Sequence, residues 1–273
     1  MARIRRLNIF TGISASLRFG LFWLIVFLQL PVIVLLPRGR FSVAYMRVFM
    51  WFLVFLTGIR IRVHGTLSRH RPLLVVTNHI SLFEIATYPI AFGGSFVAKK
   101  EIESWPLVGW VARKFGVIFV DRRPSHAADA LKMVQETVTK VKYPMFLFPE
   151  GTTTNGAYVK AFKSSLFNFV ENSDVMVQPM AMRYTFRDGT PISDADLAEH
   201  FAYFNNKDME CGPYCSRERS AFAQIFHVML VGGFNVEINV LPIPDLRGMD
   251  RKQIATTLHE IVSQKYTELK QGN

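Results

Sequence analysis

Two apolar runs occupy the N-terminal part of the chain. The first extends from Phe19 to Leu36 without a charged residue, and the second extends from Val43 to Ile59 with Arg47 inside it. A helix that spans a membrane needs about 20 apolar residues. Because the first run is borderline for a span and the second is interrupted, a helical hairpin inserted in one leaflet fits about as well as a full span. A pair of buried core helices is the remaining alternative.

Beyond Arg60, short apolar runs alternate with amphipathic stretches. Helical spacing marks 127–141, 162–170 and 254–269, and a capping box of Asp250 and Gln253 precedes the last. Strands alternating with helices predict an α/β fold with a mixed sheet flanked by helices, whose strand order the sequence does not fix. The candidate strands are Leu73–Thr77, Ser95–Ala98, Val117–Val120, Met145–Phe148, Val175–Met182 and Phe234–Leu241.

The composition narrows the class of partner. Hydrophobic residues make up 50% of the 273 residues and Phe alone counts 24, which favours a lipid-facing surface. The net charge of +11 fits anionic lipid or an acidic substrate, and since no nucleic-acid-binding motif accompanies it, we expect no nucleic-acid partner. Cys211 and Cys215 have no second pair at metal-ligand spacing, so we interpret them as free thiols.

Two polar segments directly follow apolar runs and carry the candidate chemistry. In the first, His79 and Glu84 stand five positions apart after the run 73–76. An imidazole at the end of a strand lies at a sheet edge, and a Glu at this spacing can hold one ring nitrogen while the other acts as a base. The second segment, Phe-Pro-Glu-Gly-Thr-Thr-Thr at 148–154, follows the run 145–147.

These segments resemble motifs of the glycerolipid acyltransferase family, which includes the 1-acylglycerol-3-phosphate acyltransferases. The pattern Asn-His, four residues, then Asp or Glu, reads Asn78 to Glu84 here, and Gly-x-x-Phe-Ile/Val-Asp-Arg reads Gly116 to Arg122. Phe-Pro-Glu-Gly-Thr reads Phe148 to Thr152, and an apolar strand with a proline reads Val177 to Ala181. The motifs occur in order, and the resemblance covers roughly residues 60–245.

The resemblance implies an N-terminal two-helix membrane-docking element followed by the acyltransferase domain. We therefore divide the chain into a membrane-associated helical hairpin, 1–59, and an α/β acyltransferase domain, 60–273. The segment 187–219 is the least regular part, and we interpret it as a surface insertion, with a lid over the substrate site as the alternative.

The implied reaction is acyl transfer from a thioester to a hydroxyl. His79 is the expected base that takes the hydroxyl proton, and Glu84 is expected to orient its ring and stabilise the imidazolium. Backbone amides near Gly151 are candidates for stabilising the charged oxygen. For Glu150, a structural carboxylate that holds the loop is as acceptable as acceptor binding. By the resemblance, the acceptor- or phosphate-binding residues are Lys100, Arg122, Glu150, Gly151, Thr152 and Thr153.

Two positions depart from the usual family pattern. Glu84 stands where Asp is usual, which lengthens the arm by one methylene but occurs in many branches of the family. Thr153 stands where lysophosphatidate acyltransferases often carry Arg. A doubly charged phosphomonoester would lose one cationic partner there, so the hydroxyl suggests a less charged acceptor, such as a lysophospholipid with a substituted headgroup or a lyso-aminolipid.

The sequence thus predicts an O-acyltransferase that moves a fatty acyl chain from acyl-CoA or acyl carrier protein to a lysophospholipid or other lysolipid. Neither a metal nor a prosthetic group is implied. The expected partners are membrane lipid, the lysolipid and the acyl donor. The expected location is the cytoplasmic face of a bacterial inner membrane, with the endoplasmic reticulum as the alternative. The rival interpretation is a non-catalytic membrane-binding protein that retains the fold.

Overall fold

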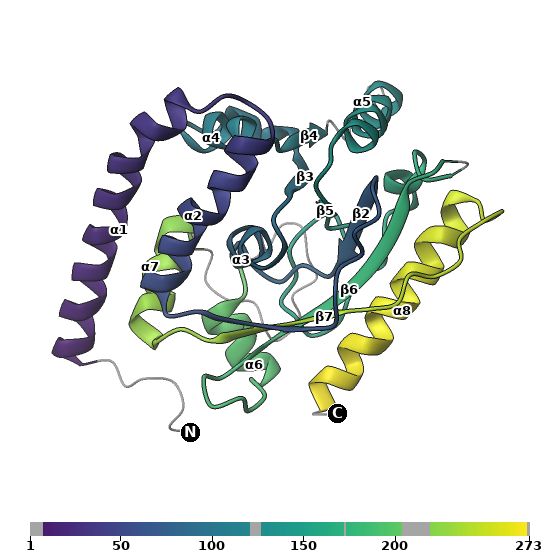
Figure 1. Ribbon diagram of the computed structural model, residues 1–273. Coiled ribbons are helices and arrows are strands. Elements are labelled where there is room, and N and C mark those ends of the chain that lie inside the picture. Colours follow the sequence, from purple (N-terminus) through teal and green to yellow (C-terminus); the bar gives the residue numbers. More distant parts are fainter. Residues whose placement is uncertain (1–7, 121–126, 172, 204–218, 272–273) are drawn as a thin grey trace.

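The computed structural model describes residues 8–120, 127–171, 173–203 and 219–271 (Figure 1). Within them, a seven-stranded sheet has the order β1-β7-β6-β2-β5-β3-β4. Its neighbouring strands are parallel except for β6 and β7, which are antiparallel, so the predicted mixed sheet is confirmed. The strands are β1 (Arg60–His64), β2 (Leu73–Thr77), β3 (Ser95–Lys99), β4 (Ile118–Val120), β5 (Met145–Leu147), β6 (Met176–Thr185) and β7 (Asn235–Val240).

Helices connect the strands and flank the sheet. The longer ones are α1 (Ile9–Leu35), α2 (Arg40–Thr57), α3 (Phe83–Phe92), α5 (Ala127–Lys140), α7 (Ala221–Val231) and α8 (Arg251–Gln271). The short turns are α4 (Val108–Lys114), α6 (Asp194–Asp196), the 3₁₀ helices η1 (Lys100–Ser104) and η3 (Ser164–Phe167), and the π-helical η4 (Leu197–Phe201).

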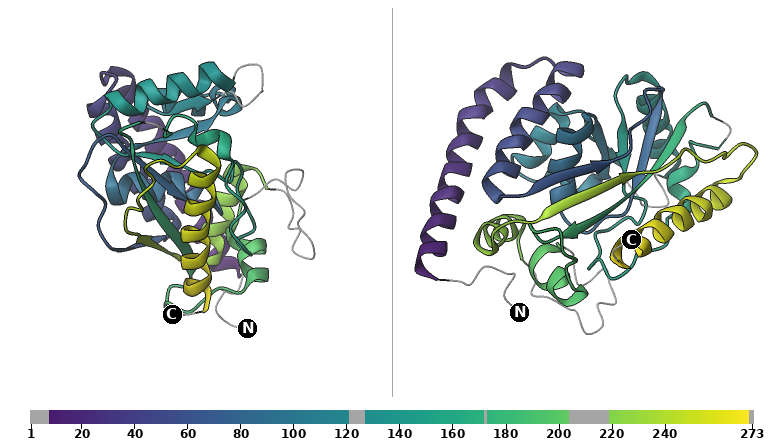
Figure 2. Two further views of the ribbon diagram at one scale, coloured as in Figure 1. Left: turned by 90° about the vertical axis from the view of Figure 1, so that its right-hand side faces the viewer. Right: turned by 60° about the horizontal axis from the view of Figure 1, so that its bottom comes forward.

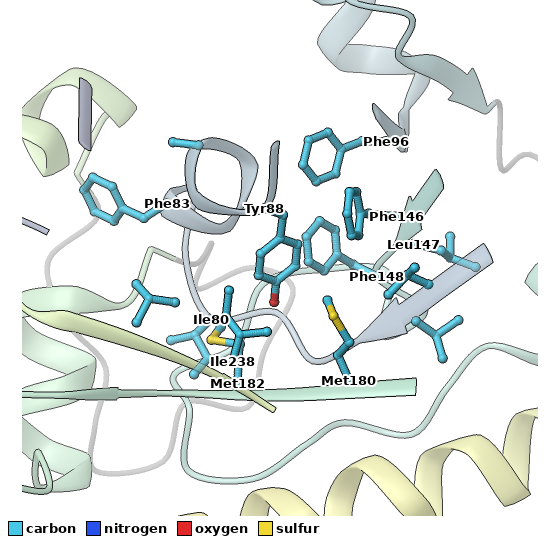
Figure 3. Packing of buried hydrophobic residues seen from close by; sticks show 14 of the residues in the cluster. Ile80, Phe83, Tyr88, Phe96, Phe146, Leu147, Phe148, Met180, Met182 and Ile238 are labelled. Atoms are coloured by element: carbon cyan, nitrogen blue, oxygen red, sulfur yellow. The ribbon is translucent and has the colours of Figure 1, made fainter. Parts of the chain in front are cut away.

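The layers follow from which faces of the sheet are apolar. The whole of β2 is buried, as expected for a central strand covered on both faces. Helix α3 lies over one face, and α8 packs along β6 on the other (Figure 3). Helices α1 and α2 lie outside α3, at the far side of the molecule from α8 (Figures 1 and 2).

An aromatic cluster fills the core beneath α3. Phe146 and Phe148, from β5 and the residue after it, meet Tyr88 of α3 and Phe96 of β3 (Figure 3). Ring centroids in this cluster lie 5.3–6.0 Å apart, which is the range of favourable aromatic pairs. The cluster gives the loop that follows β5 a rigid base.

Helix α1 is apolar on two opposite faces. Ala15, Phe22, Val26 and Ile33 face the protein and are buried. Side chains on the other face remain exposed, at up to 84% for Leu35. A surface helix that is apolar all round requires a second apolar environment. By length and composition alone, α1 and α2 could each cross a membrane. Other exposed apolar residues of α1 are Phe10, Ile13, Leu17, Leu24, Phe27 and Leu28.

The predicted strands and most of the predicted helices are confirmed. The capping box forms as predicted, because Asp250 N–H donates to Gln253 Oε1 and Gln253 N–H donates to Asp250 Oδ1. The helical spacing at 162–170 is realised only as the short η3, so a longer helix there was a wrong prediction. Strand β1 and helices α4 and α7 were not predicted, and part of the irregular segment, 194–201, is helical. Cys211 and Cys215 lie outside the described residues.

Candidate active site

The candidate site lies at one edge of the sheet. Strands β2, β5 and β3 are parallel neighbours, so their C-terminal ends meet at the same edge. His79 follows β2 by two residues, and the loop 148–154 follows β5 directly. The parallel strands therefore bring these two motifs, which are far apart in the sequence, close together in space.

His79 and Glu84 form a hydrogen-bonded pair. The Nδ1 of His79 lies 2.7 Å from Oε2 of Glu84. Glu84 is in the first turn of α3 and is fully buried, so its charge is held by specific donors rather than by water. Ser81 N–H donates to the same Oε2 at 2.9 Å, and the Tyr184 hydroxyl donates to Oε1. The carboxylate is thus fixed from three sides.

The ring of His79 is also fixed by stacking. It lies on the ring of Phe148 with centroids 3.8 Å apart and an interplanar angle of 14°. The His79 side chain is 13% exposed, whereas Glu84 is fully enclosed. Because Nδ1 is engaged by the carboxylate, Nε2 is the nitrogen that can face a substrate hydroxyl. The predicted pairing of these two residues is confirmed as a geometric arrangement.

Glu150 reaches into the backbone rather than toward solvent. Its two carboxylate oxygens accept hydrogen bonds from the N–H of His79 at 2.7 Å and the N–H of Lys160 at 2.8 Å. Burial raises the pKa of Glu150 to about 8, although the two N–H groups pull that pKa down. Of the two interpretations of Glu150, this geometry supports the structural carboxylate that holds the loop.

Two further residues hold the backbone around His79. Thr154 donates from its N–H, at 2.8 Å, and from its hydroxyl, at 3.2 Å, to the His79 carbonyl. The side-chain amide of Asn78 accepts from the N–H of Met182 and donates to its carbonyl, both at 2.9 Å. Asn78 therefore extends the pairing of β2 with β6 by one side chain. The backbone around His79 is held before any substrate arrives.

The remaining predicted residues take different positions. Gly151 has a φ of 77°, a conformation that favours glycine, and its N–H donates to the carbonyl of Phe148 at 3.1 Å. Thr152 and Thr153 are half-buried in the loop between Gly151 and Thr154. Lys100 begins η1 after β3 and pairs with Glu103 at 2.6 Å, so its role in acceptor binding stays a prediction. Arg122 lies outside the described residues.

Sequence analysis did not identify Tyr184 or the stacking of Phe148. Tyr184 is on β6, where side chains alternate, so that Met180, Met182 and Tyr184 share a face. Figure 3 shows Met180 and Met182 on the side of α3. The alternation indicates that Tyr184 points to the face of Glu84, but nothing in the sequence links the two residues across 100 positions.

Among the residues that the structure describes, no group of three or more His, Cys, Asp and Glu side chains could hold a metal ion. The arrangement instead offers a buried carboxylate, an oriented imidazole and a rigid loop, which suffice for general base catalysis on a hydroxyl.

Comparisons with known proteins match the same region. The family model described as Acyltransferase matches residues 60–183. A lyso-ornithine lipid O-acyltransferase of Pseudomonas aeruginosa is 30% identical over 236 residues, which cover 83% of this chain and 81% of that protein. A 1-acyl-sn-glycerol-3-phosphate acyltransferase of Neisseria gonorrhoeae is 32% identical over 112 residues, covering 41% of this chain and 44% of that protein.

A solved structure has the same fold. The crystal structure of a 1-acyl-sn-glycerophosphate acyltransferase from Thermotoga maritima matches with a TM-score of 0.64 over 95% of this chain and 98% of that one. Sequence identity is 18%, so this likeness concerns the fold alone. It confirms the α/β architecture with its N-terminal helical pair.

Proposed function

The chain belongs to the acyltransferase family, and from this premise we propose that it transfers a fatty acyl chain from a thioester donor to the hydroxyl of a lysolipid. The single observation that carries the proposal is the His79–Glu84 pair, held at 2.7 Å at the edge of the sheet. The relatives named above are O-acyltransferases of lysolipids, which supports the same class of reaction.

His79 acts as the general base in the proposed mechanism. The acceptor oxygen attacks the thioester carbonyl carbon while its proton passes to Nε2 of His79. Glu84 stabilises the imidazolium through Nδ1, the acyl–sulfur bond breaks, and the imidazolium returns the proton to the leaving thiolate. The products are an ester and a free thiol. The substrate hydroxyl occupies the role that a serine has in a triad, so no acyl-enzyme is required.

The charged oxygen of the transition state needs donors in the loop 148–154. The N–H of Gly151 already donates to Phe148, and that of Thr154 donates to His79. The amides of Thr152 and Thr153 are therefore the better candidates. They belong to a loop that Glu150 and Thr154 hold rigid, as preorganised stabilisation requires.

For the acceptor, we favour a lyso-aminolipid of the lyso-ornithine type. Thr153 offers a hydroxyl where a phosphomonoester site often carries Arg, and ornithine carries an amine and a carboxylate in place of a phosphate. The relative in Pseudomonas aeruginosa, which the match covers over most of its length, is a lyso-ornithine lipid O-acyltransferase. Lys100, and Arg122 outside the described residues, are proposed to contact the headgroup.

The donor is acyl-CoA or acyl carrier protein, and no metal or prosthetic group is needed. Both α1 and α2 present apolar side chains outward, which supports association with a membrane. We propose that the protein lies at the cytoplasmic face of a bacterial inner membrane, because the relative from Pseudomonas aeruginosa, which matches over most of its length, is bacterial. The endoplasmic reticulum is the alternative location.

The test is acyl transfer by the purified protein in detergent, from labelled acyl-CoA and acyl carrier protein, to a panel of lysolipids. The panel contains lysophosphatidate, lysophosphatidylethanolamine and lyso-ornithine lipid. We expect His79→Ala to lower the rate by about 10²–10⁴-fold, the usual contribution of a general base. The control is His70→Ala, because His70 is exposed and lies before β2. Equal rates for His79→Ala and the wild type would overturn the mechanism.

Thr153→Arg tests the acceptor in the same assay. An added guanidinium is expected to improve lysophosphatidate relative to lyso-ornithine lipid by about tenfold, the equivalent of one modest charge-assisted hydrogen bond. An unchanged acceptor preference would show that Thr153 does not select the acceptor.

A further inference from the structure

The turn between η1 and α4 exposes a compact group of apolar side chains. Trp105 is 45% exposed, Leu107 39% and Val108 37%, and Pro106 between them is also exposed. Single exposed apolar residues are ordinary, but several in a row form a patch that needs a partner. The proposed catalytic mechanism does not involve these residues.

The backbone of the turn is rigid, so it holds these side chains in their exposed positions. Gly109 N–H donates to the Trp105 carbonyl at 3.0 Å, and Val111 N–H donates to the Leu107 carbonyl at 2.9 Å. A Cβ at Gly109 would lie 2.0 Å from the Glu103 carbonyl oxygen, so the chain packs too closely there for any other residue. Leu107 has a φ of 62°, which L residues rarely adopt.

The turn belongs to the same rigid body as the end of the N-terminal hairpin. Lys114 of α4 donates through Nζ to the carbonyls of Val34 and Leu36 at 2.9 and 2.7 Å, where α1 ends. Phe115 packs on Phe49 of α2 with centroids 5.6 Å apart. Figure 1 shows α4 beside the turn that joins α1 to α2.

The hairpin also exposes apolar side chains at the end that Lys114 binds. There, Val34 is 55% exposed, Leu35 84% and Phe41 56%. Two separate chain segments at the ends of α4 therefore expose apolar side chains, which favours a broad apolar partner over a narrow peptide.

The charges around this surface are mainly positive. Arg38 and Arg40 are exposed in the hairpin turn, and Arg113 accompanies Lys114 on α4. The acidic neighbours are Glu101, which is exposed, and Glu103, which pairs with Arg113 and with Lys100. Cations beside exposed tryptophan and leucine match the interface of an anionic bilayer, where tryptophan is enriched and basic residues meet headgroups.

We propose that the turn 105–108 is a second membrane contact, which inserts Trp105 and Leu107 into the interface of an anionic bilayer beside the hairpin. The inference rests on the proposed function, which places the lysolipid substrate in that bilayer. The turn follows η1, which begins at the C-terminal end of β3, on the edge of the sheet that carries His79. The contact holds this edge against the lipid, so that a lysolipid reaches the site without leaving the membrane.

The test uses a protein whose one tryptophan is Trp105, made by Trp23→Phe, Trp51→Phe and Trp110→Phe. It is mixed with vesicles of brominated phosphatidylcholine and phosphatidylglycerol. We expect the Trp105 emission to shift to the blue and to be quenched by the bromine atoms. Vesicle binding without quenching of Trp105 would overturn the proposal.

Leu107→Asp tests the energetic contribution in the otherwise native protein. We expect the affinity for anionic vesicles to fall about tenfold, because a charge replaces an apolar side chain at the interface. Asp also tolerates a positive φ better than most residues, and a thermal melt reports whether the variant is folded. The control is Ile243→Asp, because Ile243 is exposed to a similar degree, 37%, in the loop that follows β7. Equal losses in both variants would overturn the proposal.

Acyl transfer to a lysolipid in detergent micelles separates this inference from the proposed function. Leu107→Asp is expected to keep the wild-type rate in micelles and to lose rate on vesicles. If the wild type fails to transfer acyl chains at all while Trp105 is still quenched, the proposed function fails and the membrane contact stands.

Discussion

Glu84 is a buried carboxylate whose two oxygens serve three donors from different parts of the chain. His79 Nδ1 and Ser81 N–H share Oε2, and the Tyr184 hydroxyl takes Oε1. A buried charge is tolerated only when its oxygens are paired, and removing one partner is costly. Tyr184 therefore holds Glu84 in the rotamer that meets His79, and it acts on the reaction through that carboxylate.

Tyr184→Phe is expected to lower kcat about tenfold with little change in KM for the acceptor, because an unpaired buried oxygen costs about 1–3 kcal/mol and disturbs the carboxylate behind the base. Steady-state kinetics and a thermal melt check this. Tyr88→Phe is the matched control. Tyr88 is also buried, but its hydroxyl forms its hydrogen bond with that of Thr77, at 3.1 Å, rather than with Glu84. We expect it to lose stability and keep kcat, and a similar kcat loss in both variants would contradict the positioning role.

The site residues could be located from the sequence, but not all of their roles could be assigned from it. The spacing of His79 and Glu84 predicts a pair because both follow one strand, and local geometry decides the contact. Glu150 could not be assigned in this way. Its partners are backbone N–H groups of His79 and Lys160, and only the folded path of the loop brings these together. Side-chain chemistry is read from sequence, but backbone partners are not.

Elements are joined by cations at helix ends. Arg18 of α1 donates to the carbonyls of Leu56 and Met229, near the ends of α2 and α7. Arg47 of α2 donates to Ile90 near the end of α3 at 2.9 Å. The C-terminal end of a helix carries partial negative charge, so each cation stabilises a neighbouring helix. Arg47, which interrupts the second apolar run, therefore fastens the hairpin to the domain.

A histidine pair joins η4 to α7. His200 Nδ1 lies 3.1 Å from His227 Nε2, with the rings nearly parallel. Burial, together with the charge of Arg219 and the nearby His200, lowers the pKa of His227 to about 4. Burial also lowers the pKa of His200, while Glu199 and Asp196 raise it and Arg219 lowers it. Both rings therefore favour the neutral form in the folded protein.

His227→Gln is expected to reduce the loss of thermal stability between pH 7 and pH 4. The folded pKa of His227, about 4, lies below the ordinary histidine pKa of 6.5, so between these values the unfolded chain binds a proton that the folded chain does not. Stability is therefore present above pH 6.5 and is lost as the pH falls toward 4. Glutamine does not titrate, so this component disappears. Melting temperatures across this range check it, with His70→Gln as an exposed control. An unchanged slope would contradict the assignment.

Element predictions failed where burial was unusual. Strand β1 contains Ile61 and Val63 between charged residues, but it is an edge strand and most of its residues are exposed. Edge strands lack the continuous apolar run that marked β2. The segment 162–170 shows the opposite error. Its apolar spacing reflects packing of a 3₁₀ turn against α8, and not a longer helix.

At the scale of the whole molecule, the sequence predicted layers but not topology. Alternating strands and helices indicate a sheet covered on both faces, and that is present. The reversal of β7 and β1 relative to the other five strands depends on pairings between distant segments, such as Met180 of β6 with Val240 of β7. Such pairings leave no local pattern in the sequence. The fold class was accessible, and the strand order was not.

The whole molecule also bears on whether the N-terminal hairpin spans a membrane. Helix α1 has 27 residues and is about 40 Å long, enough to cross the hydrocarbon core of about 30 Å. It is nevertheless fastened to the domain along its length. Phe19 packs on Phe226 with centroids 5.3 Å apart, and the carbonyls at its C-terminal end are bound by Lys114. A full span would have to break these contacts or carry the domain into the bilayer.

We therefore expect the hairpin to lie in one leaflet, with the turn between α1 and α2 on the side of the catalytic domain. A cysteine replaces Arg38 in this turn, in a background with Cys211→Ser and Cys215→Ser, and the protein is bound to preformed vesicles. A membrane-impermeant thiol reagent trapped inside the vesicles should leave Arg38→Cys unlabelled. Lys252→Cys, at an exposed position of α8, should be labelled by reagent added outside. Labelling of Arg38→Cys from the lumen would show that the contacts of Phe19 and Lys114 open in the membrane, because the turn then lies across the bilayer from the catalytic domain.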